Sequence, residues 1–134
     1  MVIQFNGGTI SWACRKQSCV SLSTAEAEFV ALAEATQEML WVKRLLGDLG
    51  EEQQDPLLYE DNQSALKMLD VGKFSNRTKH IATKYHFVRD IKTSGEICFV
   101  YCPTKDMVAD LLTKPIGGTR LAQLRTMCGL QDQR

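Results

Sequence analysis

Three carboxylates from separate predicted elements are candidates for a common metal site. Glu28 lies in a long amphipathic stretch, Asp61 directly follows a predicted strand at 57–60, and Asp110 lies within the segment Val108–Pro115. The three acids belong to separate predicted elements and share no local partner, so they suggest ligands for hard divalent cations, which prefer oxygen donors. Two such cations can hold both oxygens of an in-line phosphoryl displacement. The residue types therefore predict a metal-dependent reaction on a phosphoryl group.

Helical geometry distinguishes Glu28 from the other acids of its segment. At about 100° per residue, Leu32 and Met39 fall within about 40° of Glu28, on the apolar stripe of the predicted helix. Glu26 falls about 160° away, on the solvated face. A carboxylate at the head of an apolar stripe is costly unless a backbone cap, an arginine or a metal binds it. For Glu28 all three explanations stay open.

Each of the other two acids has an ordinary alternative role. Asp61 stands between a predicted strand and a predicted helix, where the ligands of α/β sheets gather. An aspartate at that position also serves as a helix N-cap. Asp110 is expected inside a short helix, where an exposed acid is equally ordinary. The combination with Glu28, and neither acid alone, favours a metal site.

Local signals predict the elements that position these acids. Asn6-Gly7 predicts a hairpin between strands at 2–5 and 9–13. Ser23 and Glu26 form a capping box that starts a helix reaching about residue 49. Further helices are expected at 62–69, 78–93, 104–114 and 120–127, and strands at 57–60, which should be buried, and 97–101. This order is that of a mixed α/β domain, with Trp12 and Trp41 expected in its core.

The composition fits one globular domain spanning residues 1–134. The 134 residues are 44% hydrophobic and 24% charged, which excludes a disordered tail or a fibre. No secretory signal pattern is seen, and no apolar run approaches the roughly 20 residues of a membrane helix. An intracellular protein without membrane contact is therefore expected. The five cysteines are odd in number and lack metal-binding spacing, which fits free thiols in such a compartment.

A net charge of zero conceals two blocks of opposite sign. From Glu26 to Asp61 ten acids accompany two bases, and from Lys67 to Lys92 seven bases accompany two acids. The two blocks can pair within the molecule. Alternatively, an acidic site beside a basic surface can act on a polyanion. Charge alone leaves both interpretations open.

Four motifs carry a resemblance to a known family. In chain order they are ISWACRKQSCVSLSTAEAEFVALAEA, YEDNQSAL, RTKHIATKYHFVRD and VYCPTKDMVADLLTKP. Over about residues 7 to 130 the chain resembles the ribonuclease H domain of copia-type retrotransposon polyproteins. The resemblance implies a ribonuclease H-like fold, an α/β architecture with a mixed β-sheet flanked by helices. It also implies hydrolysis of the RNA strand of RNA/DNA hybrids during reverse transcription.

The resemblance assigns catalytic and metal-binding roles to Glu28, Asp61 and Asp110, and it implies two Mg²⁺ ions. The chain departs from the family at the first strand. The family's first catalytic aspartate lies on that central strand and has no counterpart here, because no acid precedes Glu26. Without the strand we expect two sheet fragments with unpaired edges. We also expect the site to be weak or inactive.

The resemblance implies an RNA/DNA hybrid as the substrate. Telling RNA from DNA requires contacts to the 2′-hydroxyl, and Asn62, Gln63 and Ser64 are candidate donors by position. Their alternative role is an ordinary capped helix start. Lys79 and His80 are candidate phosphate contacts, with core packing as the alternative.

Three functional hypotheses follow from the sequence. The first is a ribonuclease H module, completed by the reverse transcriptase domain of a polyprotein or by a strand from another segment. The second is a non-catalytic remnant that binds nucleic acid. The third is a co-opted protein acting by interaction, such as a host regulator or a secreted effector, although no secretory signal favours secretion.

Overall fold

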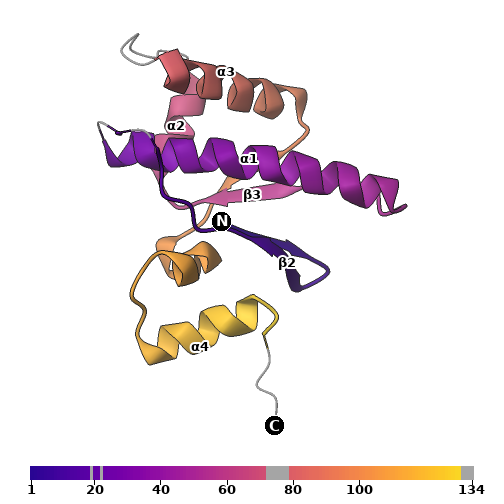
Figure 1. Ribbon diagram of the computed structural model, residues 1–134, viewed down its shortest axis with the longest axis vertical. Helices are drawn as coiled ribbons and strands as arrows, with labels where there is room; N and C mark the ends of the chain where they lie inside the picture. Colours follow the sequence, from indigo (N-terminus) through magenta and orange to yellow (C-terminus); the bar gives the residue numbers. More distant parts are fainter. Residues whose placement is uncertain (19, 22, 72–78, 131–134) are drawn as a thin grey trace. The chain divides into compact units, whose positions relative to one another are not determined.

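The structure is a computed structural model that describes residues 1–18, 20, 21, 23–71 and 79–130. The chain divides into two compact units. Unit 1 comprises residues 1–16 and 103–134, and unit 2 comprises residues 17–102. Both contain helices and strands, so the predicted mixed α/β class is confirmed (Figure 1). The expectation of a single domain stays a prediction.

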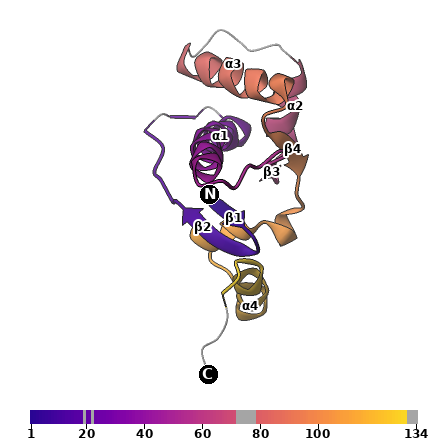
Figure 2. The same cartoon turned by 90° about the vertical axis from the view of Figure 1, so that its right-hand side faces the viewer.

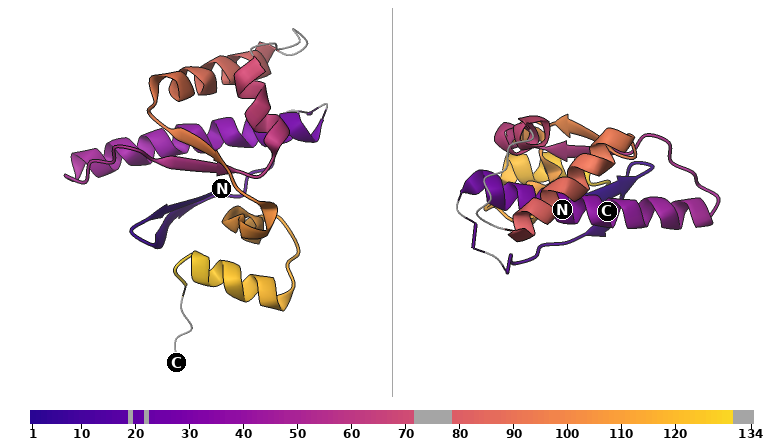
Figure 3. Two further views of the ribbon diagram at one scale, coloured as in Figure 1. Left: turned by 180° about the vertical axis from the view of Figure 1, so that it is seen from behind. Right: turned by 90° about the horizontal axis from the view of Figure 1, so that it is seen from above.

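Unit 2 contains the longest helix and a pair of parallel strands. Its elements are α1 (Thr24–Asp48), β3 (Leu57–Glu60), α2 (Gln63–Val71), α3 (Lys79–Ser94) and β4 (Cys98–Tyr101). The N-cap of α1 is Ser23, whose side-chain oxygen accepts the backbone N–H of Glu26 at 3.1 Å, as the capping box predicts. Strands β3 and β4 lie side by side in parallel (Figures 2 and 3). Parallel strands need a long crossover, and α2 and α3 provide it.

The core of unit 2 is built from its helices, β3 and the residue that precedes β4. Helices α1, α2 and α3 contact one another, and α2 also contacts both strands. The buried cluster comprises Phe29, Leu32, Ala33, Leu40, Leu58, Leu69, Tyr85, Val88 and Ile97. In β3, Leu58 and Glu60 are buried while Leu57 and Tyr59 are exposed. The prediction of a fully buried strand is therefore wrong, because successive side chains of a strand point to opposite faces.

Unit 1 combines a hairpin, two short 3-10 helices and a terminal helix. Its elements are β1 (Val2–Phe5), β2 (Gly8–Trp12), η1 (Thr104–Asp106), η2 (Val108–Leu112) and α4 (Gly118–Met127). The hairpin turns at Asn6 and Gly7, whose φ values of 49° and 78° match the predicted Asn-Gly turn. The single helix predicted over 104–114 is wrong. Met107 has extended backbone angles (φ −72°, ψ 102°) and separates η1 from η2.

Side chains of the hairpin bind the carboxyl end of α4. The hydroxyl of Thr9 donates to the carbonyl of Cys128 at 3.0 Å, and the amide of Gln4 donates to the carbonyl of Met127. Gly129 follows with a φ of 78°, and a Cβ there would lie 2.5 Å from the carbonyl oxygen of Gly7. Only glycine fits this close approach of two backbones.

The described residues form two separate two-stranded sheets, β1–β2 and β3–β4. This agrees with the expectation of two sheet fragments, and within the described ranges the single mixed sheet that the resemblance implies is not formed. The core assignment of two tryptophans is wrong, since Trp12 is 66% and Trp41 58% exposed. None of the helices in the described ranges is both long and apolar enough to cross a lipid bilayer.

Candidate metal centre

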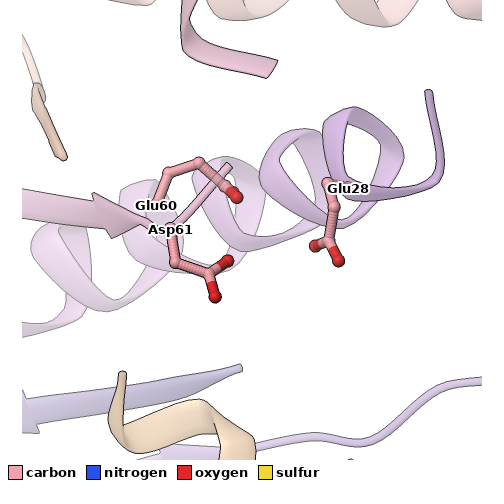
Figure 4. Close-up of side chains that lie close together, drawn as sticks. All are labelled: Glu28, Glu60 and Asp61. Carbon is pink, nitrogen blue, oxygen red and sulfur yellow. The ribbon is translucent and has the colours of Figure 1, made fainter. Parts of the chain in front are cut away.

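Three carboxylates gather at one point of unit 2. Glu28 projects from the second turn of α1 toward Glu60, the last residue of β3, and toward Asp61, which follows it (Figure 4). One oxygen atom of each side chain lies within 4.8 Å of the others. The structure thus brings together two of the three predicted acids, and it adds Glu60, which sequence reasoning missed.

Hydrogen bonds at the start of α2 position Glu60 and Asn62, the two residues that flank Asp61. The side-chain oxygen of Asn62 accepts the N–H groups of Ser64 at 2.9 Å and Ala65 at 3.1 Å, so Asn62 is the N-cap of α2. The alternative role of Asp61 as that N-cap is therefore wrong. A carboxylate oxygen of Glu60 accepts the N–H of Asn62 at 2.9 Å. This bond holds the Glu60 side chain beside the start of α2.

Glu60 is the most buried member of the cluster, at 7% exposure. Its pKa is raised from 4.5 to about 7, mainly by burial and to a smaller extent by the negative charges of Glu28 and Asp61. The hydrogen bond from the N–H of Asn62 acts in the opposite direction and only partly offsets the rise. A divalent cation would relieve this repulsion, and three carboxylates match the oxygen donors that Mg²⁺ prefers. The residues present therefore fit such an ion.

Asp110 lies in unit 1, within η2, and is 4% exposed. One carboxylate oxygen lies 2.9 Å from the ammonium of Lys114, and the other lies 2.7 Å from the guanidinium of Arg120. The alternative of an exposed helix acid is wrong. Its predicted role as a metal ligand and catalytic residue stays a prediction, as do those of Glu28 and Asp61.

The predicted substrate-binding residues fall at the starts of two helices. Asn62 caps α2, while Gln63 and Ser64 are exposed in its first turn. Lys79 and His80 begin α3, but their side chains lie outside the described part of the structure. All five assignments to substrate binding stay predictions.

The burial of Glu60 had a signal in the sequence. Strand alternation places it on the same face as Leu58, two residues earlier, so an apolar residue and an acid share the covered face of β3. An acid on a covered face next to a second acid indicates a site. A strand expected to be buried along its whole length leaves this alternation of exposed and buried side chains out of account.

Comparison with known proteins identifies relatives among retrotransposon polyproteins. The chain is 36% identical over 128 residues to the retrovirus-related Pol polyprotein from transposon TNT 1-94 of Nicotiana tabacum, covering 96% of this chain and 10% of that protein. It is 38% identical over 122 residues to the Pol polyprotein from transposon RE1 of Arabidopsis thaliana, covering 90% and 8%. The chain thus spans about a tenth or less of these polyproteins.

A shorter match links the chain to a different kind of protein. The chain is 49% identical over 41 residues to the secreted RxLR effector protein 161 of Plasmopara viticola, covering 31% of this chain and 29% of the effector. No protein-family model matches, and no solved structure shows a significant match. The two polyprotein matches each cover at least nine tenths of the chain. Over most of its length, the chain is therefore homologous to a segment of the Pol polyproteins of copia-type retrotransposons.

Proposed function

We propose that this chain is a ribonuclease H module of a copia-type Pol polyprotein, acting on the RNA strand of RNA/DNA hybrids. One observation carries the proposal: Glu28 and Asp61 come from a helix and a strand end, yet their carboxylates meet, with Glu60 beside them. The motifs that contain Glu28 and Asp61 are two of the four on which the resemblance to ribonuclease H rests. Homology to Pol polyproteins over most of the chain gives independent support.

The proposed site uses carboxylates to hold Mg²⁺. Glu28 and Asp61 would supply ligand oxygens, and Glu60 would add a third once it is ionised. Bound Mg²⁺ would activate water and stabilise the charge that develops on a phosphodiester. The protein's part is to orient these side chains, which the N–H bond from Asn62 does for Glu60. The hydrogen bonds that cap α2 fix the backbone at Asn62, the residue after Asp61.

The hybrid is proposed to bind beside the start of α2. Gln63 and Ser64 are exposed there and can approach a 2′-hydroxyl, which distinguishes RNA from DNA. Asn62 is a weaker candidate, since its side-chain oxygen already serves the N-cap. Lys79 and His80 are proposed as phosphate contacts, and such contacts give affinity that falls steeply with salt.

A further strand with an acid is proposed to complete the module. Within the described residues β3 pairs with β4 alone, so its other edge has no strand partner. Residues 1–25 contain no acid. We propose that another segment of the polyprotein, adjoining the reverse transcriptase domain, supplies this strand. Residues 1–134 by themselves are therefore expected to be weak or inactive.

A hybrid-cleavage assay tests the proposal. Residues 1–134 are incubated with an RNA/DNA hybrid and Mg²⁺ or Mn²⁺, alone and with an added first-strand peptide that carries the acid. We expect no cleavage alone and RNA-strand cleavage with the peptide. Asp61→Asn should abolish that cleavage, whereas an exposed-acid control, Glu51→Gln, should not. Cleavage that survives Asp61→Asn, or none in the completed protein, would contradict the proposal.

A second candidate is a co-opted, non-catalytic protein that acts by interaction. The 49% identity over 41 residues to a secreted effector supports it. On this account the completed chain binds nucleic acid or protein but does not cut a hybrid with either metal. The same assay, combined with a binding measurement on the hybrid, separates the two candidates.

A further inference from the structure

We propose that Asp110 acts in this chain as a buried counter-ion that fastens the Thr104–Leu112 segment to α4, and that Mg²⁺ binding at the acidic cluster does not depend on it. The first half stands on the contacts of unit 1 alone. The second half rests on the proposed function.

Both oxygens of the Asp110 carboxylate bind cations. Oδ1 accepts from Lys114, one helical turn later, at 2.9 Å, and Oδ2 accepts from Arg120 of α4 at 2.7 Å. The same guanidinium nitrogen of Arg120 donates to the carbonyl of Thr104 at 2.6 Å. A single arginine therefore joins the start of η1, the acid of η2 and the first turn of α4.

Burial makes these contacts important for the fold. The Asp110 side chain is 6% exposed, against 46% for Lys114 and 34% for Arg120, so the acid lies beneath its two partners. A buried carboxylate is costly unless it is paired, and charge-assisted hydrogen bonds of this length are strong. Arg120 Nε is buried without a hydrogen-bond partner among the described residues, so the guanidinium is held through its terminal nitrogen.

The segment depends on such a link because its own structure is weak. Both η1 and η2 are 3-10 helices, three and five residues long, and neither has a side-chain N-cap hydrogen bond. Short 3-10 turns have poor hydrogen-bond geometry and gain little stability by themselves. The ion pairs with Lys114 and Arg120 supply what the local structure lacks.

The same contacts leave Asp110 poorly suited to ligate a metal. A cation would have to displace the ammonium of Lys114 or the guanidinium of Arg120, and it would leave a positive group without its partner. The acidic cluster has the opposite arrangement, since Glu28, Glu60 and Asp61 bring three negative groups together. Mg²⁺ relieves repulsion there, but it would break favourable contacts at Asp110.

Thermal unfolding of the full chain tests the counter-ion role. Asp110→Asn is expected to lower Tm by about 5–10 °C, because it leaves two cations without their partner. Asp106→Asn, an exposed acid in the same segment, should change Tm by less than about 2 °C. The Asp110→Asn/Arg120→Gln double variant should lose less stability than the sum of the two single losses, since each single variant already removes the Asp110–Arg120 pair. Additive losses, or no loss for Asp110→Asn, would overturn the first half.

Calorimetry with Mg²⁺ alone tests the second half. Asp110→Asn should keep the wild-type affinity within about twofold, while Asp61→Asn should weaken it at least about tenfold, as expected for loss of a ligand. Equal losses would overturn the inference. Should Asp110→Asn fail to fold, the carboxyl ¹³C signals of the wild-type chain give the answer. Mg²⁺ should then shift the signals of Glu28 and Asp61 and leave that of Asp110 unchanged.

If the proposed function is wrong, the same measurements give a different result. A wild-type chain that binds no Mg²⁺ at all would refute the metal centre and, with it, the second half of the inference. The change in Tm for Asp110→Asn would still decide the counter-ion role. A shift of the Asp110 carboxyl signal on adding Mg²⁺ would contradict the inference while supporting the metal centre.

Discussion

Two carboxylates, one in each unit, are about equally buried but have opposite surroundings. Asp110 is 4% exposed and lies between Lys114 and Arg120. Glu60 is 7% exposed and lies beside two further acids. Unit 1 therefore uses its buried acid to stabilise its fold, whereas unit 2 keeps its buried acid at a cost in stability. A cost of that kind is typical of a site kept for binding or catalysis.

The largest expected effect is that of a substitution at Gly129, and it should be confined to unit 1. Gly129→Ala places a Cβ 2.5 Å from the carbonyl oxygen of Gly7 at a φ of 78°, so we expect a loss of roughly 2–5 kcal/mol in the free energy of unfolding. The buried cluster around Phe29 lies wholly in unit 2, so amide exchange should quicken in α4 and stay slow in α1. Gly117→Ala is the control, since nothing lies within 4 Å of its Cβ. Equal quickening in both helices would show that the units are not independent.

The next effect concerns the cost of burying Glu60. The pKa of Glu60 is raised from 4.5 to about 7 in the folded protein. Stability is therefore highest below pH 4.5, where Glu60 is protonated in both states, and it falls as pH rises through about 7, where the buried side chain must ionise. Glu60→Gln removes the ionisation and should stabilise the protein at pH 8 by roughly 1–2 kcal/mol, after allowance for solvent screening. At pH 4 the two proteins should be nearly equal. Urea unfolding at both pH values measures the difference, with exposed Glu51→Gln as control; a destabilised Glu60→Gln at pH 8 would count against the account.

The affinity for Mg²⁺ should rise over the same pH range in which the stability of the protein falls. A proton on Glu60 competes with Mg²⁺, so the affinity should rise by up to about tenfold between pH 6 and pH 8. In Glu60→Gln the rise should disappear. Calorimetry in buffers of different ionisation enthalpy would also detect release of the proton. An affinity independent of pH in the wild-type chain would exclude Glu60 as a ligand.

The smallest effect is expected at an exposed ion pair. Lys92 lies 2.5 Å from Asp70, but the side chains are 37% and 65% exposed. Solvent-exposed pairs of this kind contribute about 0–1 kcal/mol, so Lys92→Gln should change stability by no more than about 0.5 kcal/mol. A loss as large as that of Asp110→Asn would mean that burial does not explain the role of Asp110.

Signals confined to a few residues predicted the elements well. Asn6-Gly7 marked the hairpin, Ser23 marked the start of α1, and Gly50 and Gly95 follow their helices with positive φ values. Each of these signals works through the conformation of one turn or one cap, so no distant residue is needed to read it. Helical periodicity placed Glu28 at the head of the apolar stripe of α1, and the structure brings its carboxylate beside those of Glu60 and Asp61.

Long-range contacts were not predictable in the same way. The pairing of Asp110 with Arg120 joins two elements, and nothing in their spacing indicates it. Lys114, four residues from Asp110, was a readable partner by its spacing alone, although η2 ends at Leu112. Trp41 was misplaced although the same 100° rule puts it about 140° from Glu28, opposite the apolar stripe. Bulk and apolar character alone were a poor guide to the core.

Magnesium titration calorimetry on matched helix variants tests the central claim most directly. Glu26 and Glu28 lie two residues apart in α1, and the acidic cluster includes Glu28 with Glu60 and Asp61. If the central claim holds, Glu28→Gln weakens Mg²⁺ affinity at least about tenfold, while Glu26→Gln changes it less than about twofold. Equal losses in the two variants, or no loss in Glu28→Gln, would contradict it.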